Sequence, residues 1–319
     1  MNKATAPGKI ILLGEHAVVY GQPALAIPVT QVGVTVQIDL DETSNGETNR
    51  SWKDLISVCA PDIDRSGLLS HFPTTKDPIS LVIELVMKEM GITIPPKCHI
   101  KIESSIPVAS GMGSSAASSV ALARAFSSIL GQELEDGIIS RIAFEAEKLH
   151  HGTPSGIDNT VITYAKPVFY IKDQKIDTLQ VREPFTLIIA DSGIRISTAE
   201  SVGDVRKLWL GEPEKYGSIF SQIGEIVKQG KHAMHDGDID LLGQLMIRNQ
   251  SLLEELTVSS PTLERLCEAA FVRGALGAKL SGGGRGGNMI ALVCSEEASS
   301  VEKALIKAGA TKTFISRVE

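Results

Sequence analysis

Residues 106–119 read "IPVASGMGSSAASS", a stretch rich in glycine, serine and alanine. Upstream, apolar and polar residues alternate over 98–103, which is typical of a strand with one buried face. Downstream, apolar residues recur at i, i+4, i+7 and i+8 from Leu122, and Gly131 stands where a helix can end. The stretch therefore predicts a turn between a strand and a helix rather than a flexible linker.

Two glycines in this turn favour the binding of a ligand. Gly111 and Gly113 let the backbone approach a ligand closely, and the first amides of the following helix have no partner within the helix. Such a turn suits a phosphate. The stretch has neither the lysine of the Walker motif nor the spacing of dinucleotide-binding glycines, and by itself it equally fits an ordinary N-capped helix.

The length and composition predict a globular protein with two lobes. The chain has 319 residues, more than one hydrophobic core usually accommodates, and 43% of them are hydrophobic. Its net charge of −7 and absence of basic runs argue against a partner that is a nucleic acid or a membrane surface. An anionic substrate would therefore have to be met by local donors or by a metal.

The cysteines and the N-terminus indicate a cytoplasmic protein. The four cysteines are widely spaced, so we expect neither a zinc site nor disulfides but four buried free thiols in a reducing compartment. The early apolar run "IILL" is too short for a signal peptide or a membrane span.

The mixture of periodicities predicts an α+β fold with an N-terminal lobe at 1–165 and a C-terminal lobe at 166–319. Residues 41–75 are polar and we expect them to be irregular. Strands are expected at 9–14, 32–40, 98–103, 167–171, 185–193 and on both sides of the glycine cluster 282–287, and helices at 79–90, 135–150, 214–234, 239–256 and from Pro261, with Ser259 or Ser260 as its cap.

Four stretches together carry a family resemblance. They are "APGKIILLGEHAVVYG" (6–21), "PVASGMGSSAA" (107–117), "EKLHHGTPSGIDN" (147–159) and "KLSGGGRGGNMIAL" (279–292). In this order and spacing they resemble the superfamily of galactokinase, homoserine kinase, mevalonate kinase and phosphomevalonate kinase, the GHMP kinases. Within it "GEHAVVYG" looks like the mevalonate kinases, because galactokinases continue differently after Gly-Glu-His and carry Arg where this chain has Lys9.

The resemblance implies a fold, an activity and its partners. The fold would be the two-lobed GHMP kinase fold, with an N-terminal lobe like the second domain of a ribosomal protein and a ferredoxin-like C-terminal lobe. The activity would be ATP-dependent phosphorylation of the 5-hydroxyl of mevalonate in isoprenoid biosynthesis, with Mg²⁺ as cofactor. Another GHMP kinase activity or a non-catalytic ligand-binding role stays open. Members of the family are often dimers, so a homodimer is an option by analogy alone.

The same resemblance assigns the catalytic and nucleotide-binding residues. Asp158 would accept the hydroxyl proton, although an aspartate in a glycine-rich turn is ordinarily only a turn former. Lys9 would lie beside Asp158 and the transferred phosphoryl group, although a surface lysine is the simpler reading. The loop that wraps the ATP phosphates would comprise Pro107, Ala109, Ser110, Gly111, Met112, Gly113, Ser114, Ser115 and Ala116.

Metal and substrate residues follow from the family pattern as well. Ser115 and Glu147 match the magnesium ligands, although helical periodicity places Glu145 nearer the apolar face and Ser114 competes with Ser115. Residues on the substrate side would be Glu15, His16, Ser155 and Thr198. The third glycine motif departs from the family at Arg285 and Asn288, and the sequence does not decide whether Arg285 contacts phosphate or solvent.

Overall fold

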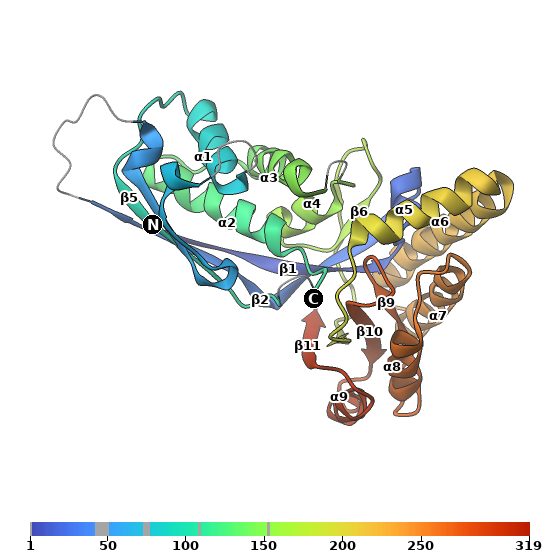
Figure 1. Cartoon of the computed structure of the whole chain (residues 1–319). Helices are drawn as coiled ribbons and strands as arrows, with labels where there is room; N and C mark the ends of the chain where they lie inside the picture. The colour runs from blue at the N-terminus through green and yellow to red at the C-terminus, as the bar shows by residue number, and fades with distance from the viewer. Residues whose placement is uncertain (1, 42–50, 73–76, 108–109, 152–153) are drawn as a thin grey trace. The chain divides into compact units, whose positions relative to one another are not determined.

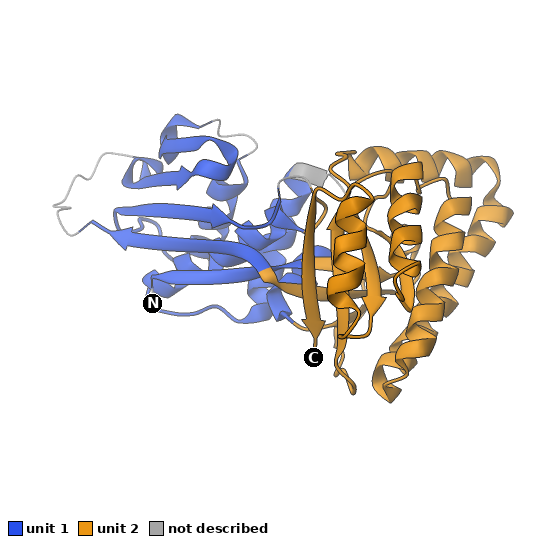
Figure 2. Cartoon of the chain, turned by 90° about the horizontal axis from the view of Figure 1, so that it is seen from below, with its two compact units in different colours: residues 1–8, 32–108, 113–165 blue, residues 9–31, 109–112, 166–319 orange. Residues whose placement is uncertain are grey.

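The computed structural model describes residues 2–41, 51–72, 77–107, 110–151 and 154–319. The chain divides into two compact units (Figure 2). Unit 1 comprises residues 1–8, 32–108 and 113–165, and unit 2 comprises 9–31, 109–112 and 166–319. The glycine-rich stretch 106–119 therefore contributes residues to both units.

Two long strands also contribute residues to both units. Strand β1 (Lys3–Leu13) pairs with β2 (Ala24–Leu40). Val34, Val36 and Ile38 on β2 are fully buried, which confirms the alternation expected there. The strand begins earlier than expected because its first residues also have a partner: Ala24, Leu25 and Ala26 pair with β6.

The sheet of unit 1 continues from the second half of β2. Strand β5 (Cys98–Ser104) lies antiparallel to β2 and parallel to β3 (Ile56–Ala60), and β4 (Arg65–Leu68) follows β3. The expectation of an irregular segment over 41–75 is therefore wrong for 56–60 and 65–68. These strands are short, and the partner of β3 lies about 40 residues later in the chain, so little local sequence pattern marks them.

Four helices pack over one face of this sheet in unit 1 (Figure 1). They are α1 (Pro78–Glu89), α2 (Ser114–Ile129), α3 (Asp136–His151) and α4 (Ile157–Tyr164). Helix α2 contacts the other three, so its alanines are buried as fully as Leu122 and Phe126, while Ile129 at its end is only half-buried. Short 3₁₀ helices precede β3 at Trp52–Leu55, connect β3 to β4 at Pro61–Ile63 and follow β4 at Leu69–His71.

Unit 2 contains a separate antiparallel sheet with the strand order β11-β8-β10-β9. Its strands are β8 (Phe185–Asp191), β9 (Gly277–Ser281), β10 (Asn288–Val293) and β11 (Lys312–Val318). With α8 (Pro261–Phe271) before β9 and α9 (Ala298–Lys307) before β11, this order is the ferredoxin-like arrangement expected from the family resemblance. Strands β6 (Val168–Tyr170) and β7 (Asp177–Thr178) extend the first half of β2.

The helices of unit 2 are α5 (Thr198–Gly211), α6 (Pro213–Asp236), α7 (Ile239–Glu255), α8 (Pro261–Phe271) and α9 (Ala298–Lys307), with the 3₁₀ helix η1 at Ala17–Tyr20. Helices α6 and α7 lie side by side (Figure 1). Ser260 caps α8 through a bond from the amide of Leu263, and Pro261 stands in its first turn, as expected. Among the described residues, no helix is long and apolar enough to cross a membrane.

The close packing of α7 against β9 depends on two glycines. A Cβ atom on Gly243 would lie 2.5 Å from the carbonyl oxygen of Leu276, and one on Gly277 would lie 2.5 Å from the carbonyl oxygen of Gly243. The absence of both side chains lets the helix approach the edge strand. Gln250 on α7 then accepts a bond from the amide of Leu280 at 2.9 Å, which satisfies an edge donor of β9.

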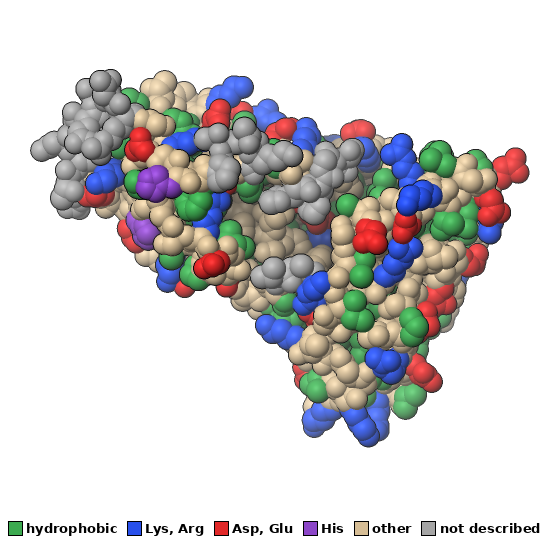
Figure 3. Space-filling model, viewed as in Figure 1, with side chains coloured by type: hydrophobic (Ala, Val, Ile, Leu, Met, Phe, Trp, Pro, Cys, Tyr) green, Lys and Arg blue, Asp and Glu red, His purple; other side chains and the backbone are tan. Residues whose placement is uncertain are grey.

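The thiols and surface charges complete the description. Cys98 and Cys267 are buried, but Cys59 is half-buried and Cys294 is exposed, so the expectation of four buried thiols is wrong for two of them. Cys294 lies directly after β10, where the chain leaves the core. On the face shown in Figure 3, positive and negative side chains are interspersed.

Candidate functional site

The stretch 110–116 forms a glycine-bordered turn at the start of α2. Gly111 and Gly113 have φ values of 79° and 75°, a left-handed conformation that favours glycine. Gly113 is the N-cap and offers no side chain, and the first helical bond runs from the amide of Ala117 to the carbonyl of Gly113. The amides of residues 114–116 therefore precede the helical ladder and are available to a bound anion.

Buried contacts within unit 2 hold the first part of this turn. The side-chain amide of Asn288 donates to the carbonyl oxygen of Ser110 at 2.7 Å, and the backbone amide of Lys9 donates to the carbonyl oxygen of Met112 at 3.0 Å. Asn288, Ser110 and Met112 are all buried. The sequence marks Asn288 only as a departure from the family pattern, whereas in the structure it links the glycine cluster 282–287 to the turn at Ser110.

Not every predicted loop residue can be placed. Pro107 is half-buried and Ala116 is fully buried in the first turn of α2. Ala109 lies outside the described residues. Ser114 is half-buried, and its carbonyl oxygen accepts a hydrogen bond from the hydroxyl of Ser118.

The two predicted magnesium ligands lie together in unit 1. The hydroxyl of Ser115 on α2 donates to the carboxylate of Glu147 on α3, and Glu147 is only 3% exposed. Glu145, which helical periodicity favoured, is half-exposed and pairs with Lys148 at 2.7 Å. A buried carboxylate next to a hydroxyl is a pair of hard oxygen donors, the type that magnesium prefers.

Asp158 lies in the first turn of α4, a helix that the sequence had suggested only as a turn. Gly156, with a φ of 88°, is the N-cap of this helix. Two neighbours of Asp158 anchor the turn: Asn159 donates to the backbone and hydroxyl oxygens of Ser140 on α3 at 3.1 and 2.9 Å, and Thr160 donates to the carbonyl of Gly156 at 2.7 Å. The half-buried Asp158 carboxylate therefore extends from a rigid part of unit 1.

Ser155 stands immediately before this helix and is half-buried. Its hydroxyl accepts a bond from the amide of Ile157 at 3.4 Å. Ser155 thus lies just outside the first turn of α4, which carries Asp158.

In unit 2, the predicted substrate residues Glu15 and His16 lie in the turn after β1, and both are buried. His16 has a φ of 60°, and its Nε2 lies 3.1 Å from the carbonyl oxygen of Gly283. Burial lowers the pKa of His16 to about 4, so the ring is neutral at pH 7 and Nε2 carries the proton that it donates to that carbonyl.

A feature that the sequence did not reveal is the partner of Glu15. The ammonium of Lys279 on β9 contacts the Glu15 carboxylate, and neither side chain has any exposed surface. Burial raises the pKa of Glu15, while Lys279 and, to a smaller extent, Lys9 oppose the rise. Burial likewise lowers the pKa of Lys279, which Glu15 opposes. Lys9 thus lies in the same electrostatic neighbourhood as the predicted substrate side.

The glycine cluster 282–287 is close to another predicted residue, Thr198. A Cβ atom on Gly283 would lie 3.1 Å from the hydroxyl of Thr198, so Gly283 has both Thr198 and His16 as neighbours. Arg285, left undecided by the sequence, pairs with Asp204 at 2.7 Å and donates to the carbonyl of Thr257 at 3.2 Å. These contacts give Arg285 a structural role within unit 2.

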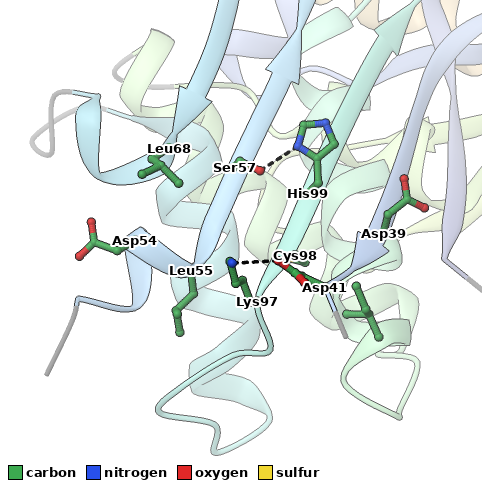
Figure 4. A pocket seen from close by; sticks show the side chains of 10 residues that line it. Asp39, Asp41, Asp54, Leu55, Ser57, Leu68, Lys97, Cys98 and His99 are labelled. Atoms are coloured by element: carbon green, nitrogen blue, oxygen red, sulfur yellow. Dashed lines mark hydrogen bonds and ion pairs between the residues drawn. The ribbon is translucent and has the colours of Figure 1, made fainter. Parts of the chain in front are cut away.

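A separate pocket of about 360 Å³ opens in unit 1 at the end of β2, beside the starts of β3 and β5 (Figure 4). Its polar groups are partly paired, since Lys97 contacts Asp41 at 2.8 Å and the Ser57 hydroxyl lies 2.8 Å from Nδ1 of His99. None of the predicted site residues lines this pocket. Within the part of the chain that the structure describes, no group of three or more His, Cys, Asp and Glu residues could hold a metal.

Known families match both halves of the chain. The N-terminal domain of GHMP kinases matches residues 77–166, and the C-terminal domain of GHMP kinases matches residues 231–311.

Individual relatives match nearly the whole length. Mevalonate kinases of Pyrococcus furiosus and Thermococcus sibiricus are 36% and 35% identical, covering 98% and 96% of this chain and 96% and 93% of their own. The crystal structure of L. major mevalonate kinase in complex with R-mevalonate is similar with a TM-score of 0.82 and 29% identity, covering 99% of this chain and 95% of that one.

Proposed function

The chain belongs to the mevalonate kinases of the GHMP kinase family, and we propose that it transfers the terminal phosphoryl group of ATP to the primary 5-hydroxyl of mevalonate, a step of isoprenoid biosynthesis. The observation that carries the proposal is the full-length similarity to mevalonate kinases, at 35% to 36% identity. The motif residues Lys9, Ser115, Glu147 and Asp158 are all present as well, which argues against a relative that has lost its chemistry.

Asp158 is proposed as the base that accepts the proton of the attacking hydroxyl. Phosphoryl transfer requires little covalent chemistry from the protein, so the base mainly orients the nucleophile and removes its proton. The anchoring of Asn159 and Thr160 supports this role, because it holds the first turn of α4 in place. Lys9, which is 4% exposed, is proposed to meet charge that develops on the phosphoryl group.

The backbone amides at the start of α2 are proposed to bind the phosphates of ATP. The left-handed Gly111 and Gly113 support this role, as do the first-turn amides, which have no partner within the helix, and the positive end of the α2 dipole. Asn288 and the amide of Lys9 contribute indirectly, because they hold the carbonyl groups of Ser110 and Met112.

Ser115 and Glu147 are proposed to hold Mg²⁺. The fit rests on their chemistry: a hydroxyl and a buried carboxylate in contact supply two hard oxygen ligands, and magnesium usually completes its shell with phosphate oxygens and water. When bound, the ion would neutralise charge on the phosphates of ATP.

Glu15, His16, Ser155 and Thr198 are proposed to hold mevalonate. The neutral His16 ring donates from Nε2 to Gly283 and can accept a hydrogen bond at Nδ1 from a hydroxyl group of a small dihydroxy acid. The half-buried Ser155 hydroxyl can donate or accept such a bond. Thr198 is exposed next to Gly283, where it remains accessible to a ligand.

The proposal also includes two properties taken from family analogy, a cytoplasmic location and a homodimeric state. Sedimentation of the purified chain tests the homodimeric state, and a monomer at micromolar concentration would contradict it.

The experiment that tests the function is ADP release with one acceptor at a time. Mevalonate, phosphomevalonate, galactose and homoserine are offered separately with ATP and Mg²⁺. The proposal predicts release with mevalonate alone. Release only with another acceptor would reassign the chain within the GHMP kinases, and no release with any acceptor would indicate a non-catalytic relative.

A further inference from the structure

The turn at residues 14–16 in unit 2 is held at each of its three positions by a different element. The amide of Gly14 donates to Asn249 on α7 at 3.1 Å. The Glu15 carboxylate contacts Lys279 on β9, and the His16 ring contacts the carbonyl of Gly283 at 3.1 Å. Three separate anchors on consecutive residues indicate that the position of this turn is closely controlled.

The backbone of this turn needs such support. His16 has a φ of 60°, a conformation that a residue with a side chain rarely adopts, and Gly14 has a φ of 103°. Strained conformations persist where surrounding contacts fix them, and they occur often at functional sites. The anchors on Glu15 and His16 are contacts of this kind.

Strand β9 provides the central anchor through two residues on one face. Lys279 and Ser281 are two positions apart, so their side chains point to the same side of the strand. Ser281 accepts from the amide of Ile11 at 3.1 Å and donates to its carbonyl at 2.9 Å, which fixes the end of β1. Lys279 contacts Glu15 just beyond and also donates to the carbonyl of Leu280 at 2.6 Å.

The Glu15–Lys279 pair is poorly explained by stability alone. Both side chains have 0% exposure, and removing two charges from water costs enough that well-packed apolar residues often stabilise as much as a buried ion pair. The second carboxylate oxygen of Glu15, Nδ1 of His16 and the side-chain amide of Asn249 are also buried without a hydrogen-bond partner among the described residues. Buried polar groups are normally paired, so these three atoms can still form hydrogen bonds with a ligand.

We propose that Lys279 is a positioning residue for the phosphoryl acceptor: it holds the Glu15 carboxylate and, through the turn, the His16 ring in the geometry that receives the acceptor. This inference rests on the proposed function, in which Glu15 and His16 lie on the acceptor side. Lys279 itself touches neither substrate nor nucleotide in this scheme.

The test is a double-mutant cycle with Lys279→Met, Glu15→Gln and the double variant. In Lys279→Met, KM for mevalonate rises at least about tenfold, which corresponds to about 1.4 kcal/mol, while KM for ATP stays within about twofold. Because Lys279 acts through Glu15, the double variant has the same KM for mevalonate as Glu15→Gln alone. The double variant contains no uncompensated buried charge, so this comparison remains available if Lys279→Met fails to fold.

Arg65→Met is the matched control. It breaks the ion pair between Arg65 and Asp77, which is also largely buried but lies in unit 1 between β4 and the cap of α1. The control should lower the melting temperature and leave both KM values unchanged. A Lys279→Met variant that behaves in the same way would overturn the inference, as would independent, additive effects of Lys279→Met and Glu15→Gln.

Failure of the proposed function would give a different result. If the wild-type chain phosphorylates another acceptor, the same cycle is measured with that acceptor. The inference then predicts the same rise in KM for that acceptor in Lys279→Met, and an unchanged KM would overturn it. If the wild type neither turns over nor binds any acceptor in calorimetry, both the function and the inference are overturned.

Discussion

The hydrogen bond between Asn288 and Ser110 predicts a specific effect on nucleotide binding. In Asn288→Ala, the carbonyl of Ser110 loses a buried donor that lies 2.7 Å away. One such bond contributes about 0.5–1.5 kcal/mol net, and an unpaired buried acceptor costs about 1–3 kcal/mol. If the phosphate loop relaxes to relieve this cost, the fraction ready for ATP falls and the apparent dissociation constant rises in proportion. We expect KM for ATP to rise about five- to tenfold, with KM for mevalonate within about twofold.

The assay is initial-rate ADP release as a function of ATP concentration, with a thermal melt of each variant. Thr186→Val is the matched control, because Thr186 is buried and its hydroxyl contacts Ser295 at 3.1 Å. Thr186 pairs with Val293, at the opposite end of the β8–β10 ladder from Asn288. The reasoning is refuted if folded Asn288→Ala keeps the wild-type KM for ATP, or if Thr186→Val raises KM for ATP equally.

Three further predictions follow from the geometry. Asp158→Asn should lower kcat about 10²- to 10⁴-fold with the fold intact by circular dichroism, and near-normal turnover would exclude Asp158 as the base. Because the pKa of His16 is lowered from 6.5 to about 4, the unfolded chain takes up a proton there before the folded chain does, and the free energy of unfolding falls by roughly 3 kcal/mol as the pH drops from 6.5 towards 4. Urea unfolding should show the stability advantage of wild type over His16→Gln shrinking by about that amount over this pH range. A stability difference that stays constant with pH would contradict the prediction. Gly14→Ala should lower the free energy of unfolding by roughly 2–5 kcal/mol, because its Cβ would lie 2.6 Å from the Cα of Ala24. Gly131 also has a positive φ but has open space around it, so Gly131→Ala should lower that free energy by only about 1 kcal/mol. Equal losses in chemical denaturation would contradict the steric argument.

Much of the fold could be predicted because its signals are local. The alternation over 98–103 and the helical spacing from Leu122 correspond to β5 and α2. Strands β3 and β4 could not be predicted as readily, because they are only five and four residues long and β3 depends on β5, which lies about 40 residues later in the chain. Helix α4 is hard to predict because Ser155 and Gly156, the two residues just before it, normally mark a turn.

Much of the candidate site could not be predicted from the sequence, because its residues are held by contacts between distant parts of the chain. Glu147 was chosen by the family pattern against its helical periodicity, and its burial depends on how α3 packs against α2. Lys279 and Glu15 are 264 positions apart, so nothing in the neighbourhood of either residue reveals the pair. Asn288 was noticed only as a departure from the motif, because its partner, the carbonyl of Ser110, leaves no mark in a sequence.

The central claim, that this chain phosphorylates the primary hydroxyl of mevalonate, is tested most directly by proton-coupled ³¹P NMR of the product made from ATP and mevalonate. The account predicts a new phosphomonoester whose phosphorus couples to the two protons of the adjacent CH₂ group. A phosphomonoester without that coupling would place the phosphate on the tertiary 3-hydroxyl, and the absence of any new phosphomonoester would remove the activity altogether.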